Sequence, residues 1–227
     1  FGMLAAGNRT MASYFVETAK QEKGKGQFFY VAQEYGNEIF FGSDHGRIWR
    51  YQKQGGQFEL LQLPASSRIV EIKKINEQAI LIVTKTDGFF VYDVVSKGME
   101  HYEASRLPKA PVRSVYMDKY SEIWFEQEVP GTVAHFNAKT KVLKTEVIPV
   151  EPTSTDRSRP AFHVHEDIYG TVWVHPYGGG FSRFDRENNR LQSFYNGLSD
   201  ANWRFSNKIH SAFSDRQGNL WMCTHSK

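Results

Sequence analysis

The sequence predicts an all-β fold built from a repeated unit of four short antiparallel strands. Three observations predict it: aromatic residues are abundant beside many glycines, one motif recurs every 41 to 49 residues, and a second motif follows it at a nearly constant distance. The chain has 227 residues, of which 15% are aromatic and 18 are glycine. Aromatic side chains favour the half-buried surface of a sheet, and glycine permits tight turns between strands.

The first motif reads Asp-x-x-Gly-x-Φ-Trp, where Φ is aliphatic. It is complete at residues 167–173 and 215–221. Less complete copies end at Trp124, Phe40 and Leu81. Because Asp can bind the backbone N–H groups ahead of it and Gly can adopt a positive φ, the motif predicts a tight hairpin between the first and second strands. The Trp and the aliphatic residue before it point to opposite faces of their strand, so each sheet can pack against two neighbours.

The second motif is a glycine-containing turn and an alternating strand that ends in Tyr or Phe. This aromatic residue lies 11 residues after the Trp position in three copies and 12 residues after it in the fourth. The constant phase predicts that both aromatic positions belong to the core, and these residues are Phe40, Trp124, Trp173, Trp221, Tyr51, Tyr92, Phe136 and Phe184. Cys223 follows Trp221 by two residues, and we expect it on a buried strand as an inert side chain.

Repeats of this length with several short strands are typical of β-propeller blades. Helical repeats would need apolar residues at a spacing of 3.6, and none are found. The predicted repeats are a partial blade at 1–27, four blades at 28–64, 65–108, 109–150 and 151–199, and a partial blade at 200–227. Both ends interrupt a repeat, so we expect a fragment of one propeller, unless five blades close within the chain.

Charge and cysteine content exclude several classes of protein. The net charge is +3, and both signs are scattered, so no basic nucleic-acid surface is expected. A single cysteine cannot form an internal disulfide or a cysteine-based zinc cluster. No apolar run approaches the ~20 residues of a membrane span, and no secretory leader is visible. Because both ends look cut, we expect targeting signals to have been removed.

The last repeat resembles the two-component regulator propeller repeat, whose pattern runs Asp-x-x-Gly-Asn-Φ-Trp-Φ-x-Thr. Residues 215–224 read Asp-Arg-Gln-Gly-Asn-Leu-Trp-Met-Cys-Thr, and 195–199 read Tyr-Asn-Gly-Leu-Ser, similar to the turn before a blade in this family. The resemblance spans 28–224. It implies part of a seven-bladed propeller in the periplasmic sensor domain of a hybrid two-component histidine kinase. It also implies carbohydrate sensing, a homodimer, a membrane tether outside this segment, and no enzyme activity or nucleic-acid contact in the segment itself.

In a propeller, the loops between strands two and three and those between blades gather at one face, where ligands commonly bind. A sugar site would combine aromatic faces with charged or amide groups. The candidates on these loops are His45, Lys85, Arg157, Arg159, His175, Tyr177, Trp203 and Arg204. The preferred pair is Trp203 and Arg204, although each candidate taken singly is more often solvated surface.

Two other functions stay open. His163 and His165 face one side of a strand and can chelate a metal, but a packed strand histidine is favoured, so no metal or cofactor is predicted. No catalytic motif of known spacing occurs. A lyase similar to streptogramin lyase would need convergent histidines, namely His163, His165, His175, His210 and His225. A protein-binding scaffold is the third possibility.

Overall fold

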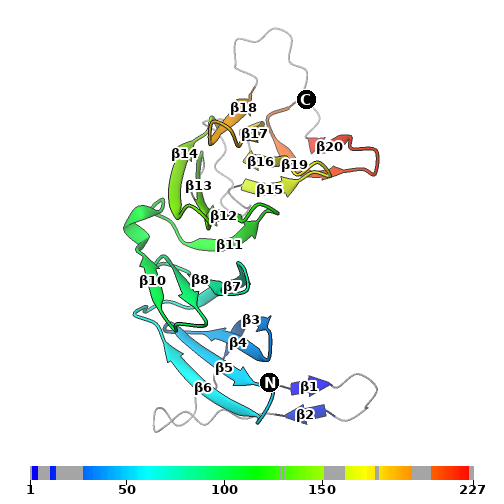
Figure 1. Ribbon diagram of the computed structural model, residues 1–227. Coiled ribbons are helices and arrows are strands. Elements are labelled where there is room, and N and C mark those ends of the chain that lie inside the picture. The colour runs from blue at the N-terminus through cyan, green and yellow to red at the C-terminus, as the bar shows by residue number, and fades with distance from the viewer. Residues whose placement is uncertain are drawn as a thin grey trace.

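A computed structural model describes residues 2–4, 11–13, 28–127, 129, 131–150, 162–176, 179–195 and 206–224. These residues form antiparallel sheets and no α-helix, and a short 3-10 turn, η1 (Ala104–Arg106), precedes one strand. The predicted all-β architecture of four-stranded antiparallel sheets is confirmed. Figure 1 shows the sheets following one another along an open arc.

Four sheets have four strands each, hydrogen bonded in chain order. Sheet I contains β3 (Phe29–Tyr35), β4 (Glu38–Ser43), β5 (Arg47–Gln52) and β6 (Gln57–Gln62). Sheet II contains β7 (Ile69–Lys74), β8 (Ala79–Thr84), β9 (Phe89–Asp93) and β10 (Met99–Tyr102). Sheet III contains β11 (Val112–Met117), β12 (Glu122–Gln127), β13 (Thr132–Asn137) and β14 (Val142–Val147). Sheet IV contains β15 (Phe162–Glu166), β16 (Val172–Pro176), β17 (Phe181–Asp185) and β18 (Arg190–Phe194).

Two shorter sheets lie at the ends of the arc. Sheet V contains β19 (Ile209–Ser214) and β20 (Leu220–Thr224), and a hairpin joins β1 (Gly2–Leu4) to β2 (Met11–Ser13). The first strands of neighbouring sheets lie side by side, as β3 with β7 and β15 with β19. The fourth strands β6, β10 and β14 lie along the outer side of the arc (Figure 1).

The core lies between the sheets rather than within any one of them. One cluster, which includes Phe40, Ile72 and Tyr92, joins sheets I and II. A second cluster around Phe89 and Phe125 joins sheets II and III, and a third joins sheets III and IV. Burying an aromatic side chain of this kind contributes about 1.5–3 kcal/mol. Each sheet is therefore stabilised chiefly by its neighbours, as the repeat pattern predicts.

The Asp-x-x-Gly-x-Φ-Trp motif is a closed hydrogen-bonded unit. In sheet IV, Asp167 Oδ1 accepts the backbone N–H groups of Tyr169 and Thr171 at 3.0 and 2.8 Å. Its Oδ2 accepts the indole N–H of Trp173 at 2.9 Å. Sheet V repeats the arrangement, with the indole N–H of Trp221 at 2.8 Å from Asp215 Oδ2. One carboxylate thus closes the turn and holds the Trp, which explains their fixed spacing.

Sheet III departs from this arrangement. Asp118 Oδ1 still accepts the backbone N–H groups of Tyr120 and Glu122 at 2.9 and 3.0 Å. Its Oδ2 instead accepts a hydrogen bond from Nη2 of Arg186, a residue of sheet IV, at 2.6 Å. The buried indole N–H of Trp124 has no hydrogen-bond partner among the described residues. The ring is held by packing, stacked on His135 at a centroid distance of 4.7 Å.

The glycine of the second motif marks a close approach between the second turn and the fourth strand. Gly88 has φ +87°, and a Cβ there would lie 2.1 Å from the carbonyl oxygen of Tyr102. Gly180 has φ +65°, and its Cβ would lie 2.3 Å from the carbonyl oxygen of Phe194. Only glycine satisfies both the left-handed backbone and the lack of space.

The predicted core positions have different environments. Phe40, Tyr51, Tyr92, Trp124, Phe136 and Phe184 are buried, and Trp173 is half-buried. The expectation of a buried Trp221 is wrong for this segment, because its side chain is 55% exposed beside Phe213. Cys223 is also exposed, contrary to prediction. The reason is shared: the described part of the chain places no further sheet against the outer face of sheet V.

Candidate ligand-binding face

The loops that join second to third strands and those that join successive sheets meet at one end of the sheets, here called the loop face. In sheet I, the backbone N–H of Gly46 donates to the carbonyl of Ser67 at 3.0 Å. The N–H of Lys85 donates to Arg68 O, and the N–H of Val112 donates to Lys85 O, each at 2.9 Å. Loops of sheets I, II and III therefore form one continuous hydrogen-bonded rim.

An exposed aromatic ring lies on this rim between a carboxylate and a guanidinium group. Tyr30 is 46% exposed and donates its hydroxyl to Asp44 Oδ2 at 2.9 Å. The Arg68 guanidinium lies 5.1 Å from the centre of its ring. The hydrogen bond to Asp44 raises the pKa of Tyr30, so this hydroxyl stays protonated at neutral pH. Ring face, carboxylate and guanidinium are the groups that a polar, ring-shaped ligand would contact.

Tyr30 owes its position to a β-bulge that recurs in the first strands. The pairing of first and second strands skips one residue at the same place in sheets I, II, III and V. The skipped residues are Tyr30, Val70, Arg113 and His210. A bulge re-aims one side chain and often lies beside a functional site. Sequence reasoning missed Tyr30 and Arg68 because neither belongs to a repeat motif. Only their positions in the chain could have indicated them. Tyr30 is the second residue of β3, and Arg68 directly precedes β7.

Two predicted candidates do lie on the loop face of the first sheets. His45 is exposed, and its Nδ1 lies 3.2 Å from the carbonyl oxygen of Ser66. Lys85 is half-buried, and its backbone joins the loop before β7 to the start of β11. The neighbouring Asp87 has a structural role, because its carboxylate accepts hydrogen bonds from Ser66 and Ser67.

His175 was predicted on a loop, but the structure places it within a strand. It lies within β16, is 3% exposed, and stands directly opposite His163 on β15. The two imidazole centroids are 5.3 Å apart. Burial, followed by the electrostatic influence of the nearby His163 and His165 side chains, lowers the pKa of His175 to about 4. His175 is therefore neutral at physiological pH.

The remaining candidates lie outside the described residues. They are Arg157, Arg159, Tyr177, Trp203 and Arg204, and His225 lies outside as well. Their role stays a prediction. Within the described ranges, no group of three or more His, Cys, Asp or Glu side chains is suited to hold a metal ion. Among these same residues, no helix is long and apolar enough to cross a membrane.

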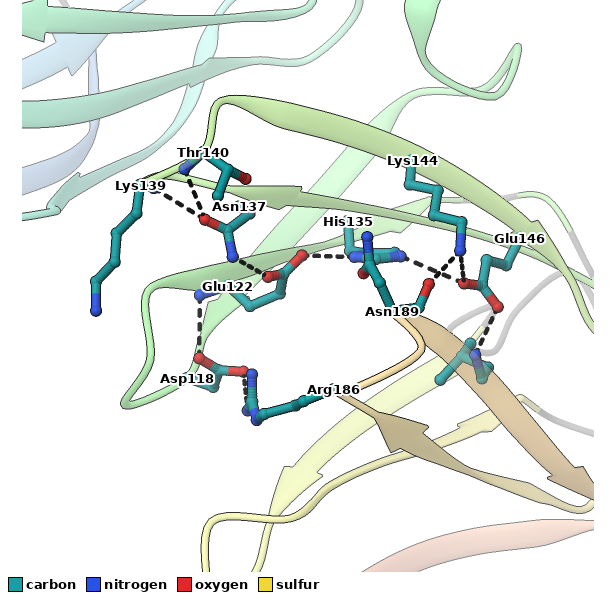
Figure 2. Close-up of polar contacts among 11 residues, drawn as sticks. Asp118, Glu122, His135, Asn137, Lys139, Thr140, Lys144, Glu146, Arg186 and Asn189 are labelled. Carbon is teal, nitrogen blue, oxygen red and sulfur yellow. Dashed lines mark hydrogen bonds and ion pairs between the residues drawn. The ribbon is translucent and has the colours of Figure 1, made fainter.

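A second polar group is buried between sheets III and IV and is shown in Figure 2. His135 Nδ1 lies 2.6 Å from Glu122 Oε1, and its Nε2 lies 3.6 Å from Glu146 Oε1. Glu146 Oε2 accepts the backbone N–H of Leu191, in sheet IV, at 2.7 Å. Because Glu122 and His135 are almost fully buried, a ligand in solution cannot contact them. We assign them to the cohesion of sheets III and IV.

Residues 204–226 match the family described as Two component regulator propeller. This part of the chain is thus one such repeat. The match covers sheet V, where the repeat pattern is most complete, and it confirms the predicted family for this repeat. No curated protein matches the chain in sequence.

Solved structures with similar folds include two extracellular domains from B. thetaiotaomicron, which belong to candidate hybrid two component systems. One, from BT4673, is 18% identical with a TM-score of 0.53, and the alignment covers 90% of this chain and 27% of that chain. The other, from BT3049, is 17% identical with a TM-score of 0.51, covering 86% and 25%. The chain thus spans about a quarter of the length of these domains.

Virginiamycin B lyase from Staphylococcus aureus has a similar fold as well. It is 14% identical with a TM-score of 0.57, covering 95% of this chain and 67% of the lyase. At such identities the likeness establishes the fold alone. The segment is part of a β-propeller, as the sequence predicts.

Proposed function

We propose that this chain is part of the extracytoplasmic sensor domain of a hybrid two-component regulator and that its loop face binds a carbohydrate. The single observation that carries the proposal is the exposed ring of Tyr30 between Asp44 and Arg68. Sugar rings offer C–H faces that stack on aromatic rings, and hydroxyls that pair with charged groups. The family match and the similar extracellular domains support the sensor role.

The intact protein would then lie in the periplasm, tethered to the membrane, and would signal to a histidine kinase as a homodimer. The segment itself would have no enzymatic activity and would not contact nucleic acid, in keeping with its scattered charges. A ligand can drive such a signal only if its affinity differs between two arrangements of the sensor. The rim of backbone hydrogen bonds through Lys85 offers a connection, because a ligand on Tyr30 would rest on loops of two sheets.

Calorimetric titration of the complete sensor region with a panel of oligosaccharides tests the proposal. We expect one glycan to bind, and Tyr30→Ala to weaken its binding at least about tenfold, which corresponds to about 1.4 kcal/mol. Tyr169→Ala is the matched control, because Tyr169 is also exposed but lies at the β15–β16 turn, away from the loop face. If no glycan binds, carbohydrate sensing is wrong. If both variants bind equally well, this site is wrong.

A lyase remains the second candidate because His163 and His175 meet near the loop face and a lyase shares the fold. Of the five histidines named for this function, His163 and His175 lie together, and His165 Nε2 lies 3.0 Å from Ser214 Oγ in sheet V. The convergence of all five stays a prediction, because His225 lies outside the described residues. Turnover of a streptogramin lactone that is abolished by His175→Ala and by His210→Ala would favour the lyase and exclude the sensor role.

A further inference from the structure

The facing histidines of sheet IV exist because β15 and β16 pair without a bulge. In the other four described pairs of first and second strands, the residue at this place is skipped. In sheet IV the register continues unbroken from Phe162 opposite Pro176 to Glu166 opposite Val172. Residues directly opposite in an antiparallel pair share one face of the sheet. His163 and His175 are therefore cross-strand neighbours on one face.

The separation of the two rings fits bidentate coordination of one metal ion. An imidazole nitrogen binds Zn²⁺ at about 2.0–2.1 Å, which places the ring centroid about 3.2 Å from the metal. Two such rings at a tetrahedral angle have centroids about 5.2 Å apart. The observed centroid distance is 5.3 Å, with the ring planes inclined by 36°.

The chemical state of His175 also suits a ligand. Its ring is neutral at physiological pH, and metals bind the neutral form of imidazole. Its Nδ1 is buried and has no hydrogen-bond partner in the described structure. A buried polar atom without a partner costs about 1–3 kcal/mol, which a metal ion bound by His175 would help to offset. His163 is exposed, so one of the two ligands is open to solution.

We propose that His163 and His175 together bind one divalent transition-metal cation of the Zn²⁺, Ni²⁺ and Cu²⁺ group. Imidazole ligands favour these ions over Mg²⁺ and Ca²⁺, which prefer oxygen. Two protein ligands leave coordination positions for water or for a polar group of another molecule. This inference does not rest on the carbohydrate proposal.

His165 is the alternative partner that the sequence pattern favours, because it lies two residues from His163 on the same strand face. Its Nε2 lies 3.0 Å from Ser214 Oγ, which directs it toward sheet V. A substitution of His165 therefore distinguishes the two pairs. It should leave metal affinity unchanged if His163 and His175 bind the ion, and lower it if His163 and His165 do.

Isothermal titration of the untagged protein with ZnCl₂ and NiCl₂ at pH 7.5 tests the site. We expect binding of one ion that His163→Ala weakens at least tenfold, while His165→Ala changes the affinity less than twofold. His163 is exposed, so this variant should fold, whereas His175→Gln serves as a second variant at the buried position. Electron paramagnetic resonance of the Cu²⁺ complex should show coupling to two nitrogens, and to one in each variant of the pair.

Three results would overturn the assignment. They are the absence of saturable binding for either ion, an unchanged affinity in His163→Ala, and a loss of affinity in His165→Ala as large as that in His163→Ala. The last result would move the site to the pair along β15.

Discussion

Arg186 and Asp118 form an ion pair across the interface between sheets III and IV, with 2.6 Å between Nη2 and Oδ2. The Asp118 side chain is fully buried, and the Arg186 guanidinium also lies 4.2 Å from the centre of the Tyr120 ring. In sheets IV and V the equivalent carboxylate oxygen binds a Trp of its own sheet. Sheet III has exchanged this internal bond for one that joins two sheets.

Arg186→Met should therefore lower the free energy of unfolding by about 3 kcal/mol, because it leaves a buried carboxylate without its cation. Urea denaturation measures the loss. Arg183→Met is the control, since Arg183 is exposed and bonds only to Gln192 among the described contacts, so its change should stay within about 0.5 kcal/mol. Equal effects of the two variants would show that the ion pair contributes nothing specific.

Trp221→Phe should raise the pKa of Asp215. The indole hydrogen bond is the main reason that this pKa lies at about 2, with Asn219 as the next contributor. A depressed carboxyl pKa stabilises the fold above the pKa of the unfolded chain, and this stabilisation is lost as pH falls toward 2. Carbon-13 NMR of the Asp215 carboxyl group measures the shift. A pKa still near 2 in the variant would contradict the role of the indole.

Gly88→Ala should destabilise the protein by about 3 kcal/mol for two reasons. The new Cβ would collide with the carbonyl oxygen of Tyr102, and the alanine would have to adopt a positive φ. Gly36→Ala separates the two causes. Gly36 has φ +55° but nothing within 4 Å of its Cβ position, so we expect about 1 kcal/mol. Thermal unfolding of both variants measures the difference. A loss for Gly88→Ala no larger than that for Gly36→Ala would mean that the turn can move away from β10.

Stability should fall as the pH drops from 6.5 to about 4, because His175 binds a proton more readily in the unfolded chain. Its pKa is lowered from 6.5 to about 4, and each unit corresponds to about 1.4 kcal/mol, so the total loss is about 3 kcal/mol. The stabilisation is complete above pH 6.5 and is lost as the pH falls to 4. His175→Gln should remove this part of the pH dependence in urea titrations. An unchanged pH profile would show that folding does not lower the pKa of His175.

The repeat motifs predict those parts of the fold that depend on local contacts. Asp167 and Trp173 are six residues apart and bond to each other directly, so their spacing predicts the hairpin. Even the weakest copy, at Leu81, forms a complete sheet, because β8 is buried on both faces. Local patterns cannot predict the bond between Asp118 and Arg186, which depends on how two sheets pack.

The candidate site was predicted less well than the fold, for reasons of register. The sequence places His163 and His165 on one face, but the unbulged pairing that brings His175 opposite His163 has no sequence motif. In the same way, Tyr30 reaches the loop face through a bulge that alternation alone does not indicate. The Trp221 expectation failed because burial needs a neighbouring sheet, whereas the hydrogen bond to Asp215 does not.

The burial of sheet III on both faces has a consequence for local unfolding. Phe125 of β12 packs in the cluster that joins sheets II and III, and the neighbouring Trp124 packs in the cluster that joins sheets III and IV. In arrays where each unit contacts only its neighbours, a unit that is covered on both faces opens late. Amide protons of β12 should therefore be among the slowest of the described residues to exchange with deuterium.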